Sequence, residues 1–258
     1  RAVEIEPTLG AARRGLAMLA LRGKRPQDAL VIARDMQKRQ PNDALGFAVE
    51  GDIEVQGRNW SAAAKAYETA LRLSDASEAA VKLHTILLAA GKGADADRLA
   101  ADWEKKRPKE PVFNFYLGDV AIQKADYPVA EAHYRAVLDS QPKNALAMNN
   151  VAWLMHKQSK PGALEMAERA NALMPNRAPI LDTLATLQAA AGKLSDAIAS
   201  QRLAVAGSPQ DSNLKLKLAK YLIEAGKKSE AREKLRALAQ LGRGFQHQEE
   251  VTTLMNSL

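Results

Sequence analysis

Residues 178–211 alternate hydrophobic and polar positions with the period of a helix. Leu181, Leu184 and Ala185 are three and four residues apart, so they fall on one helix face. Gly192 then interrupts the apolar pattern. We therefore expect a first amphipathic helix that ends shortly before this glycine.

A second helical pattern follows the interruption. Ala197, Gln201 and Ala204 share one helix face, and Pro209 closes the pattern. A proline ends a helix because it lacks a backbone N–H and its ring clashes with the preceding turn. The two helices form a hairpin that cannot bury its apolar face alone, so we expect further copies beside it.

The prolines indicate that such copies follow one another regularly. Closing prolines recur at intervals of about 34 residues in two series: Pro7 and Pro41, then Pro108, Pro142, Pro175 and Pro209. The interval from Pro41 to Pro108 corresponds to two such periods, with the middle proline replaced near Asp75. A repeating helical hairpin with this period resembles the tetratricopeptide repeat.

This period predicts an all-α, right-handed solenoid (a superhelix) of about seven repeats. The repeats are expected at residues 10–43, 44–76, 77–110, 111–144, 145–177, 178–211 and 212–241. We expect residues 1–9 to be the tail of a preceding repeat, because the chain begins at Arg1 like a part of a longer protein. Residues 242–258 are expected to form a loop and a capping helix, since a terminal repeat must cover its exposed apolar face.

Small residues recur where the two helices of each hairpin are expected to cross. In the first helices these are Ala17, Gly51, Gly118, Ala152, Ala185 and Ala219, while the third repeat has His84 at this position. In the second helices they are Ala29, Ala63, Ala96, Ala130, Ala163, Ala197 and Ala231. We interpret Trp60, Tyr67, Tyr127 and Tyr134 as side chains that fill the space between layers.

The candidate binding surface is the concave groove, which the first helices of stacked repeats line. Counting along these helices predicts the following groove residues: Phe115, Asp119, Asn149, Trp153, His156, Lys157, Asp182, Thr186, Lys217 and Lys220. The same count also places Arg14, Asp52 and Lys82 there. Trp153 either forms a binding platform with Phe115, Asn149 and His156, or fills a gap between two repeats.

Charge leaves two interpretations of the surface open. The chain has a formal net charge of +7, which fits an anionic partner such as a polysaccharide, a nucleic acid or a phospholipid surface. The alternative, which the scatter of basic residues over many repeats favours, is a solvated surface with a lysine and arginine excess. No apolar run reaches the roughly 18 residues of a membrane span, so membrane contact is expected only through an anchor outside this sequence.

The sequence predicts no catalytic, cofactor-binding or metal-binding residues. None of the four histidines forms an H-x-x-x-H or H-E-x-x-H pair, and the absence of cysteine excludes thiolate ligands and thiol nucleophiles. Residues 90–93, with the sequence AGKG, lack the strand and spacing of a phosphate-binding loop. We therefore expect a protein that is not an enzyme.

The second half of the chain carries a more specific resemblance. Residues 149–155 (NNVAWLM), 163–176 (ALEMAERANALMPN) and 180–198 (ILDTLATLQAAAGKLSDAI) are similar to the C-terminal repeats of one bacterial family. That family comprises the tetratricopeptide lipoproteins of the PEP-CTERM/exosortase exopolysaccharide system, and the resemblance extends from Asn149 to the end of the chain. It implies a periplasmic, outer-membrane-anchored scaffold for exopolysaccharide production or export; without it, a cytoplasmic protein is expected.

Three functions follow as hypotheses. The first is a scaffold that binds protein or peptide partners of an envelope polysaccharide machine through the groove. The second is direct binding of an anionic polymer, polysaccharide or nucleic acid, which salt should weaken steeply. The third is a structural spacer with no groove ligand.

Overall fold

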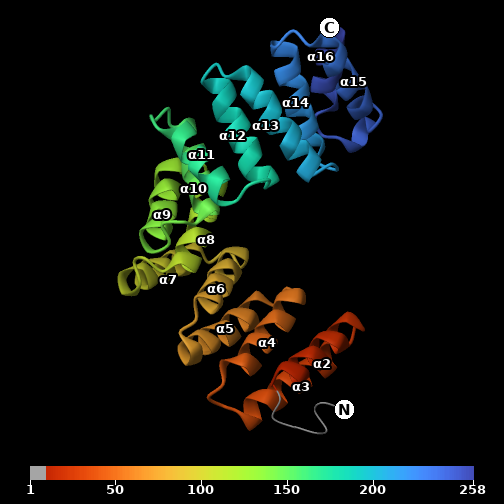
Figure 1. Ribbon diagram of the computed structural model, residues 1–258. Coiled ribbons are helices and arrows are strands. Elements are labelled where there is room, and N and C mark those ends of the chain that lie inside the picture. The colour runs from red at the N-terminus through yellow and green to blue at the C-terminus, as the bar shows by residue number, and fades with distance from the viewer. Residues whose placement is uncertain (1–9) are drawn as a thin grey trace. The chain divides into compact units, whose positions relative to one another are not determined.

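The computed structural model describes residues 10–258, and all of its regular elements are helices (Figure 1). The helices are α2 (Gly10–Arg22), α3 (Pro26–Arg39), α4 (Ala44–Gln56), α5 (Trp60–Ser74), α6 (Ser77–Ala89), α7 (Gly93–Lys106), α8 (Pro111–Gln123), α9 (Tyr127–Ser140), α10 (Ala145–Lys157), α11 (Ala163–Leu173), α12 (Ala178–Ala190), α13 (Leu194–Gly207), α14 (Ser212–Glu224), α15 (Lys228–Ala239), the 3-10 turn η1 (Gly242–Gly244) and α16 (Gln248–Asn256). The expected repeat tail at residues 1–9 lies outside the described residues.

Consecutive helices pack as hairpins. Contacts join α2 to α3, α4 to α5, α10 to α11, α12 to α13 and α14 to α15, and further contacts join each of these pairs to the next helix along the chain. Seven hairpins and a capping helix account for the described residues. The all-α solenoid of helical hairpins expected from the sequence is confirmed.

The chain divides into two compact units between Tyr116 and Leu117, within α8. The described part of the first unit is residues 10–116, and the second unit is residues 117–258. The sequence pattern showed no sign of this division, because the hairpin period continues across it without a break.

The turn inside every hairpin has one recurring backbone geometry. One residue of the turn has a positive φ, between 54° and 74°, at Lys24, Arg58, Gly91, Ala125, Ser159, Gly192 and Gly226. The next residue donates its backbone N–H to a carbonyl five residues earlier at 2.8–2.9 Å, as Asp126 does to Ala121. This is the hydrogen bond that closes a helix in the Schellman motif. Gly91, in the AGKG stretch, therefore has a turn role.

In several repeats a polar residue caps the N-terminus of the first helix. Asp43, Asn144 and Asp211 precede α4, α10 and α14, and each accepts a backbone N–H from the first turn of that helix. Such caps satisfy donors that have no partner within the helix. They fix where each first helix starts and hence which of its residues share a face.

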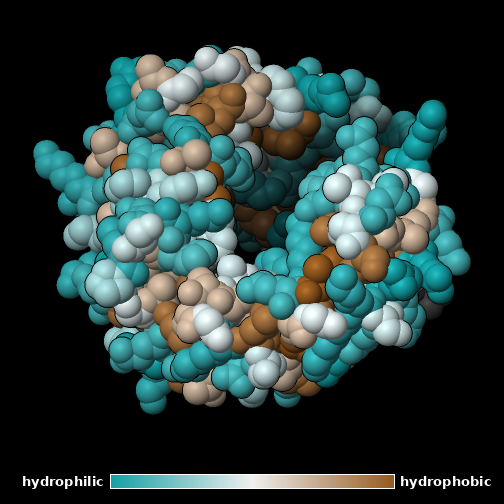
Figure 2. Space-filling view, turned by 90° about the horizontal axis from the view of Figure 1, so that it is seen from above, coloured by the Kyte–Doolittle hydropathy of each residue, from teal (hydrophilic) through white to brown (hydrophobic). Residues whose placement is uncertain are grey.

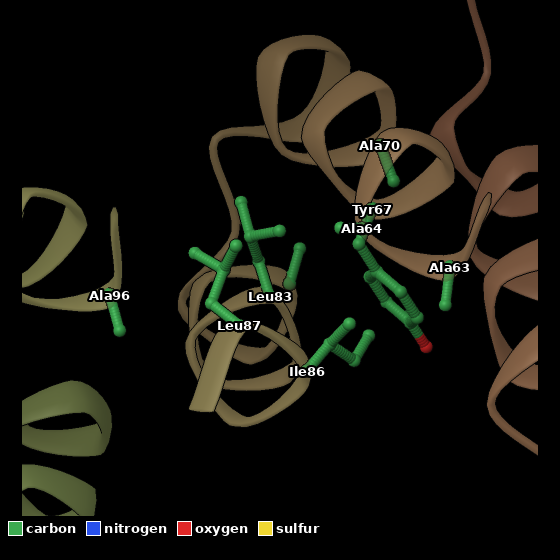
Figure 3. Close-up of a cluster of buried hydrophobic side chains, with 9 residues drawn as sticks. Ala63, Ala64, Tyr67, Ala70, Leu83, Ile86, Leu87 and Ala96 are labelled. Carbon is green, nitrogen blue, oxygen red and sulfur yellow. The ribbon is translucent and has the colours of Figure 1, made fainter. Parts of the chain in front are cut away.

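The core of the first unit consists of thin layers between neighbouring helices. Figure 3 shows Tyr67 of α5 facing Ile86 of α6, with Leu83 and Leu87 beyond it. Alanines such as Ala63, which is fully buried, bring the helix backbones close together. Burial of these side chains provides the main stabilising free energy, since each apolar Å² removed from water contributes about 25 cal/mol.

In each first helix, one buried residue lies where the hairpin's helices cross, and we call it the crossing residue. The crossing residues are Ala17, Gly51, His84, Gly118, Ala152, Ala185 and Ala219. At Gly51 a Cβ atom would lie 2.4 Å from Tyr67 Cδ2, and at Gly118 one would lie 2.7 Å from Tyr134 Cζ. Glycine is therefore needed at these two positions to leave room for the tyrosine ring.

The C-terminal helix α16 covers the last hairpin of the second unit. Val251 is fully buried against Leu235, Leu238 and Phe245. Leu254, Met255 and Leu258, the other apolar residues at this end of the chain, pack on the same cluster. The expected capping role of this helix is therefore confirmed.

The surface is mostly polar. In the view of Figure 2, hydrophobic residues form small patches separated by hydrophilic ones. The more exposed large apolar side chains include Leu19 and Val31 of the first hairpin. Among residues 10–258, no helix combines the length and apolar character needed to cross a membrane.

Candidate functional site

At three junctions, two register positions of the first helices tie one repeat to the next. One is the residue directly after the crossing residue, and the other lies two residues before the crossing residue of the following repeat. In the first unit, Lys82 Nζ lies 3.3 Å from Asp52 Oδ1, and Thr85 Oγ1 lies 3.0 Å from the Tyr116 hydroxyl. Both pairs occupy these positions, so part of the polar first-helix surface is used within the solenoid.

Asp52 and Asp119 have a second role within their own hairpins. The Tyr67 hydroxyl donates to Asp52 Oδ1 at 2.6 Å, and the Tyr134 hydroxyl donates to Asp119 Oδ1 at 2.5 Å. Burial raises the pKa of both tyrosines, and the adjacent carboxylates raise it further. The predicted site residue Asp119 thus orients the tyrosine that packs on Gly118.

His84, the one large side chain among the crossing residues, is buried with aromatic neighbours in the first unit. Its Nδ1 lies 2.8 Å from the Tyr116 hydroxyl, and its ring meets those of Phe113 and Tyr116 edge to face at 6.0 and 5.3 Å between centroids. Burial raises the pKa of Tyr116. This histidine therefore belongs to the packing of the first unit.

Three predicted groove residues of the second unit form one polar cluster. Lys217 Nζ donates to Asp182 Oδ2 at 2.6 Å and to Thr186 Oγ1 at 3.2 Å. Gln201, fully buried in α13, donates to Asp182 Oδ1 at 3.0 Å. Burial also raises the pKa of the neighbouring Tyr221. The cluster joins the last two hairpins, and its side chains largely bind one another.

Trp153 is half-buried on α10 of the second unit. Its ring meets that of Tyr127 edge to face at 5.6 Å between centroids, and Lys157 Nζ lies 5.3 Å from the Trp153 ring centroid. An ammonium group over an indole face is attracted by the ring quadrupole. Tyr127 and Lys157 therefore both contact the Trp153 ring, which remains partly exposed.

Asn149 differs from the expected groove residue. It lies one turn before Trp153 on α10 but is only 7% exposed. Its Nδ2 lies 3.3 Å from Asn150 Oδ1, while its Oδ1 accepts no hydrogen bond from the described residues. The prediction that Asn149 is exposed was wrong, because counting along one helix does not show which side chains cover a position.

The other predicted residues have separate surroundings. Lys220 forms an ion pair with Glu250 of α16. His156 is half-buried, and Phe115, also half-buried, belongs to the first unit. The structure thus brings together Asp182, Thr186 and Lys217, and separately Trp153 and Lys157.

The sequence pattern assigned Tyr67, Tyr134 and Gln201 a packing role only, and it did not predict that they hydrogen-bond the aspartates of the first helices. Tyr67, Tyr134 and Gln201 occupy one register position, four residues after the buried alanine of the second helix. A signal was present: Gly-Asp at 51–52 and at 118–119 is followed each time by a tyrosine 15 residues after the aspartate. Within residues 10–258, no group of three or more histidines or carboxylates is arranged to hold a metal ion.

Comparison with known proteins agrees with this geometry. The family model described as tetratricopeptide repeat matches residues 82–145 and 115–176. No curated protein matches the chain by sequence. Among solved structures, the APC/C hetero-tetramer Cut9–Hcn1 is 18% identical with a TM-score of 0.60; the match covers 85% of this chain and 44% of that one.

Two further structures are similar. The type IV pilus biogenesis factor PilW is 18% identical with a TM-score of 0.52, and the match covers 95% of this chain and 98% of PilW. MamA (residues 41 to the end) from Desulfovibrio magneticus RS-1 is 19% identical with a TM-score of 0.57, covering 66% of this chain and 97% of that one. This chain therefore spans under half the length of the Cut9–Hcn1 chain, and at these identities the likeness is one of fold.

Proposed function

We propose that this chain is a tetratricopeptide repeat protein that acts as a non-enzymatic scaffold and binds protein partners through its first-helix surfaces. Repeat proteins of this kind present extended surfaces for binding. The observation that carries the proposal is Trp153, which stands at the register position that Asp52, Thr85 and Thr186 use to tie adjacent repeats.

Within residues 10–258, Trp153 makes no such polar tie to the following repeat. The facing position there is Thr183, which is buried and donates its hydroxyl to the Pro179 carbonyl within its own helix. A partly exposed indole beside the Lys157 ammonium suits a partner segment that offers an apolar side chain and a carboxylate. Tryptophan is enriched among the residues that dominate binding energy at protein interfaces.

We also propose a more specific setting for this scaffold. The similarity of residues 149–258 to the exopolysaccharide-associated lipoproteins suggests partners in an envelope polysaccharide machine and a periplasmic location with an outer-membrane anchor. Deleting the gene should then lower secreted polysaccharide, and the Trp153→Ala gene should fail to restore it. Normal secretion in the deletion strain would remove this setting and leave the protein-binding role to be judged separately.

A retention experiment tests the protein-binding role. The immobilised chain is exposed to an envelope extract and washed at low and at high salt, beside Trp153→Ala and the control Trp60→Ala, which removes a tryptophan of the first unit. A protein retained at high salt and lost only with Trp153→Ala supports the scaffold. Retention of a polymer that leaves with salt and ignores Trp153 would contradict it, because counterion release makes polyanion binding strongly salt-dependent.

A further inference from the structure

The first unit contains a pocket on its first-helix surface that the Trp153 site does not include. Its volume is about 370 Å³, within the range of about 300–1,000 Å³ typical of ligand pockets. The lining residues come from α2, α4, α5, α6 and the adjoining turns, and five of them are alanines, including Ala48 and Ala79. The charged lining residues are Arg14, Asp52, Glu78 and Lys82.

The pocket exists because one register position is unusually small. Ala48 lies three residues before the crossing residue Gly51. The corresponding residues of the other repeats are all larger: Arg14, Val81, Phe115, Asn149, Asp182 and Leu216. Ala79 of the next helix is also small, whereas three of the four later repeats have a large side chain at this position (Phe113, Ile180 and Leu214) and the other has Ala147. Space that side chains fill elsewhere is therefore open here.

One end of the pocket carries surplus positive charge. Arg14 Nη2 and Lys82 Nζ approach Asp52 at 3.7 and 3.3 Å, and their side chains are 54% and 55% exposed. Asp52 already accepts the Tyr67 hydroxyl. Arg14 and Lys82 thus share the single carboxylate of Asp52, so this end of the pocket has a net positive charge. It therefore attracts an anionic group of a ligand. Glu78, one turn before Lys82 on α6, makes the opposite end unfavourable for an anion.

Helix geometry sets the length of a fitting segment. Ala44 and Asp52 are eight residues apart on α4, which corresponds to about 12 Å at 1.5 Å per residue. An extended peptide advances about 3.3 Å per residue, so three or four residues span the pocket. Ala48 and Asp52 are about 6 Å apart along the same helix. In an extended segment, side chains two residues apart are separated by about the same distance and point the same way.

We propose that this pocket binds an extended segment of a partner protein in which an apolar residue and an acidic residue are separated by one residue. The apolar side chain lies against Ala48 and Ala79, and the carboxylate lies between Arg14 and Lys82. The inference rests on the proposed protein-binding function and adds a second site with its own partner chemistry.

The test uses a displayed library of random dodecapeptides selected on the intact protein. Peptides with an apolar residue and an acidic residue two positions apart should be enriched. Ala48→Leu should weaken their binding at least tenfold in fluorescence anisotropy, and Val81→Leu should not, because it adds bulk at the same register position outside the pocket. Leu216 occupies this position in the last repeat, so leucine is compatible with the fold, and circular dichroism checks that both variants melt like the wild type.

A charge exchange gives the second measurement. Lys82→Glu should weaken binding of the enriched peptides about fivefold or more, and peptides with lysine in place of the acidic residue should regain affinity for this variant. Enriched peptides without the spacing, or an unselected library, would overturn the inference. Peptides that depend on Trp153 and ignore Ala48→Leu would also overturn it while leaving the proposed function intact. Self-association abolished by Ala48→Leu alone, in sedimentation velocity, would assign the pocket to a second copy and overturn it as well.

Discussion

The contact between Gly51 and Tyr67 makes a prediction whose size follows from the structure. In Gly51→Ala, the new Cβ would lie 2.4 Å from Tyr67 Cδ2 and 2.5 Å from Cε2. Carbon atoms prefer a separation of about 3.5–4.0 Å. The ring has little room to move, because Tyr67 is 3% exposed, lies against Ile86 and is held by Asp52 through its hydroxyl.

Two opposing terms determine the expected loss. Overpacking a well-filled core costs about 1–3 kcal/mol, and a contact with a rigid ring belongs at the upper end of this range. Replacing glycine by alanine inside a helix contributes about 1 kcal/mol of stabilisation. We therefore expect Gly51→Ala to destabilise the first unit by about 2 kcal/mol. In a Tyr67→Ala background the clash is absent, so the same substitution should stabilise by about 1 kcal/mol.

Amide hydrogen exchange measured by mass spectrometry suits this test because it reports local opening. Stacked repeats need not unfold in one step, so a global melting curve mixes several transitions. Protection in α4 and α5 should fall in Gly51→Ala and recover in the double variant. Gly15→Ala is the matched control: this glycine lies inside α2, and a Cβ placed there would have nothing within 4 Å, so this variant should gain protection. If Gly51→Ala behaved like this control, the packing argument would be refuted.

Three other predictions concern the second unit. Ala125 has a positive φ of 57°, which costs an L-residue about 1–2 kcal/mol. Ala125→Gly should therefore raise the free energy of unfolding by about 1 kcal/mol in urea denaturation. A lower free energy of unfolding would contradict this explanation. Burial alone would raise the pKa of Glu131, but hydrogen bonds from Lys160 and Arg135 outweigh this effect and lower the pKa. The ionised carboxylate therefore stabilises the fold above about pH 4.5, the ordinary pKa of a glutamate. This stabilisation is lost as the pH falls through the lowered pKa. Glu131→Gln should therefore cost about 1–2 kcal/mol at pH 7 and flatten the acid limb of a pH titration, whereas an unchanged limb would exclude this group. Val251→Ala should remove about 2 kcal/mol and selectively deprotect α16 in hydrogen exchange, and uniform protection would argue against its capping role.

The sequence predicted the fold well because its strongest signals are local. The regular repeat period, the closing prolines and the small crossing residues each constrain one hairpin, and seven hairpins repeat the same constraint. The turns show where local signals fail. Gly91 and Gly192 mark positive-φ positions, but Lys24, Arg58 and Ser159 adopt the same geometry without glycine, because the packed helices on both sides impose it.

The candidate site was predicted less completely for a physical reason. Helical counting gives the face on which a residue lies, but it does not give the distance to the next hairpin. Asp182 and Lys217 were both expected to face a partner, and they lie 2.6 Å apart in an ion pair. Asn149 was expected on the same surface and is buried. Contacts between residues of different repeats decide these outcomes, and no single repeat contains both partners.

The register itself suggests where binding specificity lies in such a protein. At three junctions the residue after the crossing residue meets a polar residue of the next repeat: Asp52 meets Lys82, Thr85 meets Tyr116 and Thr186 meets Lys217. These polar groups therefore already have partners within the stack. Trp153 stands at this tie position with a partly exposed indole in place of a polar side chain. Ala48, at a different register position, leaves space where the other repeats have a larger side chain. A residue that packing between repeats does not require can be selected for binding to a partner. We therefore expect most of the binding energy to come from residues that differ from the repeat consensus.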